Sequence, residues 1–266
     1  MLPGDGVGPE VTKLAVDVLR STASVFNHEL NVEFYDIGWS AYENYGSPLP
    51  DSTLNGCKSA DAVLLGAVGD PRGDELAPDL RPERGLLSLR KELGCFANIR
   101  PSRLLSCLSD ASPLTLEIVE NTDLVIVREL AGGIYYGEPS GIVDDGDAAI
   151  DTMKYHRDEV ARIARVAFDM AMNRTKKVTS VDKSNVLSSS RLWRNTVNEI
   201  AGEYPEVECS HMFVDRAAME LVMNPKDLDV LLTSNLFGDI LSDEAAAVVG
   251  SIGLLASASL NKDGGG

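Results

Sequence analysis

Residues 228–244 read LDVLLTSNLFGDILSDE, an apolar run that passes directly into a more polar stretch. The apolar part predicts a buried strand, and the part from Asn235 onward predicts a helix. On that helix Asp239 and Asp243 lie four residues apart and share a face. Two adjacent carboxylates repel each other unless a positive group lies between them, and hard cations such as Mg²⁺ take oxygen ligands. The pair therefore indicates a metal-assisted site for an anionic substrate or, taken alone, two solvated acids.

The rest of the chain alternates strand-like and helical patterns. Strands are predicted at residues 32–34, 62–68, 96–99, 124–127, 177–181, 207–213 and 228–233. Helices are predicted from Pro9 onward and at residues 86–93, 157–172 and 189–201. Alternation of this kind predicts an α/β architecture.

The composition is that of a soluble globular protein with an excess of acidic residues. At 266 residues the chain is long enough for one large domain or two ordinary ones. The formal charge of −17 argues against non-specific binding to nucleic acid or to an anionic membrane. The sequence contains no run of about 18 apolar residues, so we expect no transmembrane helix. Four widely separated cysteines without a Cys-x-x-Cys motif indicate thiols in a reducing compartment, so we expect a cytoplasmic protein, or an organellar one if a presequence is missing.

Three arginines stand out against this negative background as candidate substrate ligands. Arg90 lies on a predicted helix, whereas Arg100 and Arg128 lie at the ends of predicted strands. Open α/β sheets bind ligands at strand ends, and a guanidinium binds a carboxylate through two parallel hydrogen bonds. Together the three arginines could hold a substrate with two carboxylates, although each taken alone is an ordinary surface residue.

Three further residues carry groups suited to proton transfer or metal binding. Tyr135 lies in a glycine-bounded loop that can place a phenol near a ligand, with simple packing as the alternative. Lys183 follows a strand directly, and a lysine withdrawn from water or near a metal can exchange protons near neutrality. Asp215 again ends a predicted strand and is a candidate third metal carboxylate.

A glycine-rich stretch, GDGVGP at residues 4–9, precedes the first predicted helix. It differs from the dinucleotide-binding fingerprint, because the third glycine comes one residue early and no full strand precedes it. It is a weak candidate for a phosphate-binding loop, and a tight turn that needs glycine is the alternative.

Taken in order, these segments resemble the β-decarboxylating dehydrogenases of the isocitrate/isopropylmalate dehydrogenase family. The resemblance covers essentially the whole chain. The segments that carry it are LPGDGVGPEV (2–11), RPERGLLSLR (81–90), FANIRP (96–101), VREL and the residues through Pro139 (127–139), DKSNVL (182–187), VD (214–215) and NLFGDILSD (235–243). Jointly these segments are highly specific.

The resemblance implies a two-domain α/β fold that is not a Rossmann fold, with the active-site cleft between the domains. The first domain is expected to comprise residues 1–95 and 250–266. The second is expected to comprise residues 96–249 and to carry the metal site and the dimer interface. A homodimer is also implied, in which Lys183 and Asp215 enter the active site of the neighbouring subunit.

Members of this family oxidise the hydroxyl of a 2-hydroxy dicarboxylate with NAD⁺, release the β-carboxylate as CO₂ and protonate the resulting enol. By position, the ligands of Mg²⁺ or Mn²⁺ correspond to Asp215, Asp239 and Asp243. The substrate ligands correspond to Arg90, Arg100 and Arg128, with Asp215 also close to the substrate. Lys183 matches the group that accepts the hydroxyl proton, and Tyr135 the group that helps to protonate the enol. The expected NAD contacts are Gly69, Asp70 and Glu83.

Substrate choice in the family is implied to lie on the helix around Leu86. Glu83, Leu86 and Leu87 match the pattern in which leucines face an isopropyl group. A leucine pair cannot satisfy the third carboxylate of isocitrate, and an unpaired buried charge costs on the order of several kcal/mol. We therefore expect 3-isopropylmalate as the substrate, in leucine biosynthesis. The alternatives are a sister enzyme acting on isocitrate, homoisocitrate, tartrate or malate, and an inactive fragment that only dimerises.

Both ends of the chain depart from the family pattern. The family has a strand before Leu2, and beyond Leu260 it continues into a loop of the His-Gly-Ser-Ala-Pro-Asp type that binds the adenosine part of NAD. The sequence contains neither. The resemblance therefore predicts truncation at both ends, weak NAD binding and little or no activity for this chain.

Overall fold

The computed structural model describes residues 1–251, 253 and 256–262. The chain forms two compact units, one made of Met1–Cys95 with the chain from Asn261 onward, the other of Phe96–Leu260. The predicted two-domain α/β fold is confirmed. The chain was expected to return to the first domain at residue 250. In the structure the return comes after Leu260, because Ala258–Leu260 pair with the sheet of the second unit.

The first unit is built on two short parallel strands, β1 (Leu2–Gly4) and β2 (Leu65–Ala67). Its helices are α1 (Gly8–Val25), α2 (Trp39–Tyr45), α3 (Asp51–Ser59) and α4 (Pro82–Glu92). The buried centre of its core contains Leu2, Ile37, Cys57 and Leu89. The strand predicted at residues 32–34 is wrong, because the described residues 28–37 form neither helix nor strand.

Asp5 fixes the turn between β1 and α1. Its buried carboxylate accepts hydrogen bonds of 2.9–3.0 Å from the backbone amides of Trp39, Ser40 and Gly69. The carboxylate therefore ties the glycine-rich turn to the start of α2 and to the segment after β2. These contacts favour the tight turn over the phosphate-binding loop for residues 4–9.

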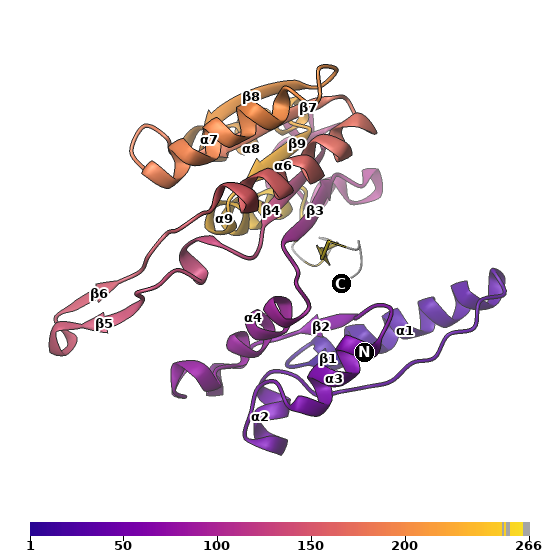
Figure 1. The fold of residues 1–266 in the computed structure, drawn as a ribbon. Coiled ribbons are helices and arrows are strands. Elements are labelled where there is room, and N and C mark those ends of the chain that lie inside the picture. The colour runs from indigo at the N-terminus through magenta and orange to yellow at the C-terminus, as the bar shows by residue number, and fades with distance from the viewer. Residues whose placement is uncertain (252, 254–255, 263–266) are drawn as a thin grey trace. The chain divides into compact units, whose positions relative to one another are not determined.

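The second unit contains a six-stranded sheet in the order β10-β3-β4-β9-β7-β8 (Figure 1). The strands are β3 (Ala97–Arg103), β4 (Asp123–Glu129), β7 (Lys177–Asp182), β8 (Glu208–Phe213), β9 (Val230–Thr233) and β10 (Ala258–Leu260). Strands β4, β9, β7 and β8 run parallel, whereas β3 is antiparallel to β4 and β10. The carboxyl ends of the four parallel strands therefore meet at one edge of the sheet.

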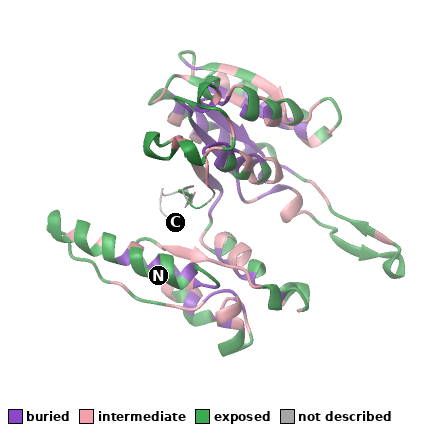
Figure 2. Ribbon diagram, turned by 180° about the vertical axis from the view of Figure 1, so that it is seen from behind, coloured by how far each residue is buried: buried purple, intermediate pink, exposed green. Residues whose placement is uncertain are grey.

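Helices cover both faces of this sheet (Figure 1). The helices are α5 (Leu116–Val119), α6 (Arg157–Met172), α7 (Ser188–Ala201), α8 (Val214–Met223) and α9 (Asn235–Val248). Alternate residues of β4 divide between two cores: Val125 and Val127 pack with residues of α6 and α7, Leu124 and Ile126 with residues of α8 and α9. Since both faces are covered, β4 reads as a continuous apolar run. Figure 2 shows the middle strands of this sheet, β4, β9 and β7, as the buried centre of the unit.

A ribbon of two antiparallel strands, β5 (Gly141–Val143) and β6 (Ala148–Ile150), projects from the second unit (Figures 1 and 2). Its residues are largely exposed, and the side chain of Ile142 is 78% exposed. Sequence patterns did not predict this ribbon, because its strands are three residues long. Within the described part of the chain we find no helix with both the length and the apolar character that crossing a bilayer requires.

Candidate active site

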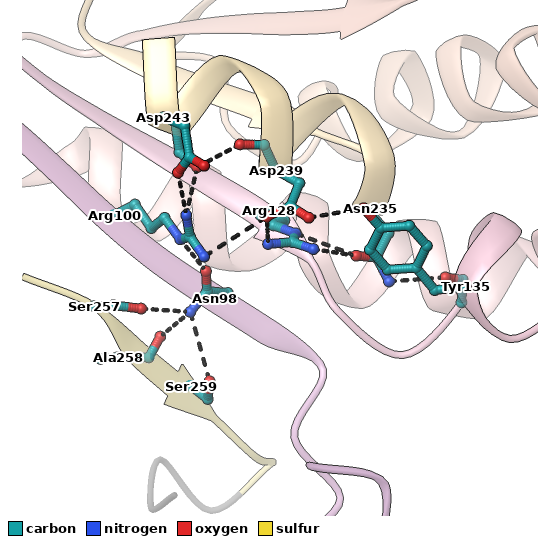
Figure 3. Close-up of polar contacts among 12 residues, drawn as sticks. Asn98, Arg100, Arg128, Tyr135, Asn235, Asp239, Asp243, Ser257, Ala258 and Ser259 are labelled. Atoms are coloured by element: carbon teal, nitrogen blue, oxygen red, sulfur yellow. Dashed lines mark hydrogen bonds and ion pairs between the residues drawn. The ribbon is translucent and has the colours of Figure 1, made fainter. Parts of the chain in front are cut away.

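Three neighbouring strands and one helix assemble two of the three predicted aspartates and two of the three predicted arginines (Figure 3). A single residue, Ser234, separates β9 from helix α9, and β9 is paired with β4 so that Thr233 lies beside Arg128. On the other side of β4, β3 carries Arg100 opposite Ile126. Asp239 and Asp243 lie on one face of α9, as predicted, and this face meets both arginines.

The positive groups expected between the two carboxylates are these arginines. Arg128 Nη1 donates to Asp239 Oδ1 at 2.5 Å, and Arg100 Nη1 donates to Asp243 Oδ1 at 3.1 Å. Arg100 Nη2 also lies 3.8 Å from Asp239 Oδ1, and its Nη1 donates to Ser242 Oγ at 2.7 Å. The four charged side chains therefore form one compensated cluster.

Gly238 makes room for Arg128 beneath α9. A Cβ atom at this position would lie 2.3 Å from Thr233 Oγ1 and 2.6 Å from Arg128 Cγ. Both distances are shorter than real contacts allow, so any side chain would displace the arginine. The glycine that precedes Asp239 in the motif thus serves the close approach of helix and strand.

Arg128 is nearly enclosed, with 3% of its side chain exposed. Burial lowers the pKa of this guanidinium, and the carboxylate of Asp239 opposes that effect. A guanidinium keeps its charge in proteins, so Arg128 is a buried cation that depends on its hydrogen-bond acceptors.

Tyr135 completes the cluster from a turn of 3₁₀ helix, η4 (Gly133–Tyr135). Its hydroxyl donates to Asp239 Oδ2 at 2.7 Å. Burial, followed by the hydrogen bond to Asp239 and the charge of that carboxylate, raises the pKa of Tyr135 to about 12. The phenol therefore holds its proton throughout the neutral range and is a potential acid.

Lys183 and Asp215 form a separate pair at the same edge of the sheet. Lys183 follows β7 directly, and Asp215 lies in the first turn of α8, just after β8. Lys183 Nζ donates to Asp215 Oδ1, and this hydrogen bond lowers the pKa of the Asp215 carboxyl. The backbone beside Lys183 is anchored by the buried Asp182, whose carboxylate accepts two hydrogen bonds from Arg194.

The three predicted metal carboxylates do not gather within one chain. Among residues 1–251, 253 and 256–262, no group of three or more His, Cys, Asp or Glu side chains is arranged to hold a metal ion. Asp239 and Asp243 supply carboxylate oxygens from successive turns of α9, which are the donors a hard divalent cation takes. Asp215 lies apart from them, paired with Lys183.

In the first unit, α4 presents the remaining substrate candidates. Glu83, Leu86, Leu87 and Arg90 follow the helical spacing that places residues on a single face. Leu89 is buried in the core of this unit, whereas Leu86 and Leu87 are half-buried. The leucine pair is therefore not needed to fill that core.

The three candidate cofactor residues lie close together in the same unit. Gly69 has a φ of +137°, and a Cβ atom there would lie 3.2 Å from Glu83 Oε1. Asp70 follows Gly69, and its carboxylate accepts hydrogen bonds of 2.8–2.9 Å from Arg72. Gly69 has no side chain to keep a ligand from the backbone, and Asp70 and Glu83 supply carboxylates. Such a loop suits the ribose hydroxyl groups of a dinucleotide.

Sequence patterns did not single out Asn98 and Asn235, which contact Arg100 and Arg128 respectively. Both lie within segments that carried the resemblance, FANIRP and NLFGDILSD. Asparagine is common beside strand ends and at helix starts, so the positions of Asn98 and Asn235 in the sequence did not indicate a functional role.

Comparison with known proteins agrees with this geometry. Residues 1–266 match the isocitrate/isopropylmalate dehydrogenase family. The chain belongs to this family. A 3-isopropylmalate dehydrogenase of Staphylococcus saprophyticus is 53% identical over 263 residues, which are 99% of this chain and 75% of that enzyme. One from Priestia megaterium is 54% identical over 266 residues, covering 99% of this chain and 72% of that enzyme.

A solved structure gives the same result for the fold of this family member. The isocitrate dehydrogenase of Methylococcus capsulatus superposes with a TM-score of 0.85 at 36% sequence identity. The superposition covers 98% of this chain and 74% of that one. The resemblance found in the sequence is therefore confirmed.

In this isocitrate/isopropylmalate dehydrogenase family member, Arg72 controls the acidity of Asp70. Hydrogen bonds from the side chain and backbone of Arg72 lower the pKa of Asp70 to about 2. We predict that Arg72→Gln raises this pKa toward roughly 4, the ordinary value for aspartate, because the charge and the guanidinium hydrogen bonds are lost while the backbone hydrogen bond of residue 72 remains. An NMR titration of the Asp70 carboxyl carbon from neutral to acidic pH measures the change.

The lowered pKa of Asp70 determines how the stability of the folded chain changes with pH. The ion pair stabilises the folded chain above the unfolded pKa, and this contribution is lost as the pH falls toward about 2. Arg84→Gln removes the same charge from an exposed arginine of α4 and should leave the pKa of Asp70 unchanged. An Asp70 that titrates alike in the unmodified and Arg72→Gln chains contradicts the prediction.

Proposed function

We propose that the site of this chain serves the oxidative decarboxylation of (2R,3S)-3-isopropylmalate to 4-methyl-2-oxopentanoate and CO₂, with reduction of NAD⁺, in leucine biosynthesis, at the weak activity that the sequence predicts. The observation that carries the proposal is the cluster of two arginines, two aspartates and a tyrosine on β3, β4, η4 and α9. It offers charge for two carboxylates, oxygens for a cation and a phenol for proton transfer. The relatives with more than half of their aligned residues identical support the choice of substrate.

The reaction needs a base, an acid and an electron acceptor. The carbon that bears the hydroxyl transfers a hydride to NAD⁺ while the hydroxyl loses its proton. The β-carboxylate then leaves as CO₂, and the electron pair of the broken bond forms an enolate, which becomes the 2-oxo acid when it takes one proton on carbon. Lys183 is the proposed acceptor of the first proton and Tyr135 the proposed source of the last.

The arginines are proposed to bind the carboxylates of the substrate. Arg128 uses three hydrogen bonds for Asn235 and Asp239, which leaves further N–H donors on its guanidinium. Arg100 likewise makes its hydrogen bonds through Nε and Nη1. Arg90, which lies on α4 with the leucine pair, is the third proposed ligand.

Asp239 and Asp243, with Asp215 of the partner subunit, are proposed to hold Mg²⁺ or Mn²⁺. The bound cation would act as a Lewis acid that stabilises negative charge on substrate oxygens. Gly69, Asp70 and Glu83 are the proposed contacts for NAD.

A homodimer is proposed because the Lys183–Asp215 pair does not join the other site residues within one chain. Exposed apolar side chains in the second unit support this. Met219 and Met223 share a face of α8 and are 61% and 59% exposed, and Ile142 lies on the exposed ribbon. We propose the cytosol as the location, and the four free cysteines fit its reducing conditions.

The substrate proposal predicts a clear preference. With NAD⁺ and Mg²⁺, the kcat/KM of the chain for 3-isopropylmalate should be at least about 10-fold above its kcat/KM for isocitrate, homoisocitrate, tartrate or malate. The reason is that the leucine pair binds an apolar branch of the substrate and offers no partner to a charged one. Leu86→Ser should reduce this preference by about 10-fold. NADH absorbance measures each rate.

A matched control is Leu14→Ser, which changes an exposed leucine of α1 in the same unit and should leave the preference intact. A faster reaction with a substrate that lacks the isopropyl group would overturn the substrate assignment. Equal rates for all substrates would overturn the role of Leu86.

The shared-site proposal predicts complementation between inactive variants. Lys183→Ala removes a group that acts in the partner subunit, whereas Asp239→Asn removes one that acts in its own. Each variant alone should be inactive, but their co-expressed mixture should recover roughly a quarter of the unmodified activity, because half of the dimers are mixed and each mixed dimer has one intact site.

The control mixture combines Lys183→Ala with Asp215→Asn. Both changes affect the partner's site, so no dimer contains an intact site and the mixture should stay inactive. Lack of recovery in the first mixture, or recovery in the control, contradicts the shared site.

A further inference from the structure

We infer that two buried asparagines, Asn98 and Asn235, are positioning residues that set the orientation of Arg100 and Arg128. Neither asparagine belongs to the residues proposed above to contact the substrate, cation or cofactor. The inference rests on the proposed function only in assigning the two arginines to the substrate. The geometry behind it is independent of that assignment.

Asn235 holds Arg128 from the side opposite to solvent. It is 1% exposed, and its Oδ1 accepts hydrogen bonds from Arg128 Nε at 3.1 Å and from Arg128 Nη2 at 2.8 Å. Its Nδ2 donates to the carbonyl oxygen of Gly132 at 3.0 Å. The carboxamide thus binds the arginine with one end and the Gly132 loop with the other.

Asn98 repeats this arrangement at Arg100 (Figure 3). It is fully buried, and its Oδ1 accepts a hydrogen bond from Arg100 Nε at 2.8 Å. Its Nδ2 donates to Ser257 Oγ at 3.0 Å and to the carbonyl oxygen of Ala258 at 3.1 Å. Arg100 is therefore linked through Asn98 to the segment that enters β10.

Only a carboxamide satisfies both partners at these positions. A guanidinium can only donate and a backbone carbonyl can only accept, so the side chain between them needs an acceptor at one end and a donor at the other. This requirement also fixes which end of each amide is the oxygen. Aspartate would set a carboxylate against a carbonyl oxygen, and alanine would leave buried N–H groups of the arginine without acceptors, at the cost of their desolvation.

The two contacts direct the arginines toward α9. Because Asn98 and Asn235 hold the Nε atoms, Nη1 of Arg100 extends to Asp243 and Nη1 of Arg128 extends to Asp239. Asn235 also couples Arg128 to Tyr135. The amide of Gly132 donates to the buried Glu129 at 2.9 Å, so Gly132, at the start of the tyrosine loop, is held at both its N–H and its carbonyl oxygen.

A role of the two asparagines in orienting the arginines can be distinguished by experiment from a role in folding. The backbone amide of Asn235 donates to the hydroxyl of Tyr155 at 2.9 Å, and this bond survives a change of side chain. Asp229 provides the matched control. It lies just before the opposite end of β9, is 5% exposed and binds Arg174 and Thr175, outside the cluster.

The first test is an NMR measurement of the Nε–H groups of the two arginines in the chain without ligand. Arg128→Lys and Arg100→Lys assign the signals. Asn235→Ala should shift the Arg128 signal and increase its exchange with water while the Arg100 signal stays, and Asn98→Ala should do the reverse. Asn235→Asp retains the acceptor, so the Arg128 signal should remain protected; this variant also serves if the alanine variant does not fold.

The second test is calorimetric binding of 3-isopropylmalate in the presence of Mg²⁺. Asn235→Ala and Asn98→Ala should each weaken binding by about 10- to 100-fold, as expected for disturbed hydrogen bonds to charged groups. Asp229→Asn should change it by less than about 2-fold. Equal losses in Asp229→Asn and Asn235→Ala, or arginine signals that do not respond to their own asparagine, would overturn the inference.

The two tests separate this inference from the proposed function. An unmodified chain that binds no 3-isopropylmalate contradicts the function but leaves the arginine signals to decide the inference. A chain that binds 3-isopropylmalate while its arginine signals ignore both asparagine changes contradicts the inference alone.

Discussion

The site depends on the compensation of one buried charge, the guanidinium of Arg128. A buried cation without acceptors costs on the order of several kcal/mol, and Arg128 has 3% of its side chain exposed. Its acceptors, Asn235 and Asp239, lie one turn apart on α9. Helix α9 must therefore start directly after β9 and pass close over β4, which Gly238 permits. This one requirement places two of the three metal-ligand candidates, Asp239 and Asp243, and the first of these is the hydrogen-bond partner of Tyr135.

Local patterns predicted much of the fold. Helix α6 begins and ends at the predicted Arg157 and Met172, because its apolar face repeats regularly over four turns. The same reasoning failed where the partner is distant in sequence. Leu14 and Val18 follow helical spacing in α1 yet are 61% and 65% exposed, since spacing reveals a helix but not what covers it. The pairing of β10 with β3 joins residues about 160 positions apart and leaves no local signal.

Some features of the site likewise follow from the local sequence, whereas others follow from contacts between residues that are distant in the sequence. The shared face of Asp239 and Asp243 follows from their spacing, but the approach of Arg100 and Arg128 follows from the order of β3, β4 and β9 in the sheet. The roles of Lys183 and Tyr135 came from the family resemblance and stay predictions. Asn98 and Asn235 escaped notice because their importance lies in what each amide joins, which only the folded chain reveals.

The cluster carries both signs of charge, so a dicarboxylate and a divalent cation can together replace its internal ion pairs without leaving an uncompensated charge. This exchange requires that the two ligands favour each other's binding. The direct measurement is a calorimetric titration with Mn²⁺, with and without saturating 3-isopropylmalate, and the reverse titration. Each ligand should tighten the binding of the other by the same factor, about 10-fold or more, and Asp239→Asn should abolish the effect. Independent binding of the two ligands, or coupling that survives Asp239→Asn, would contradict it.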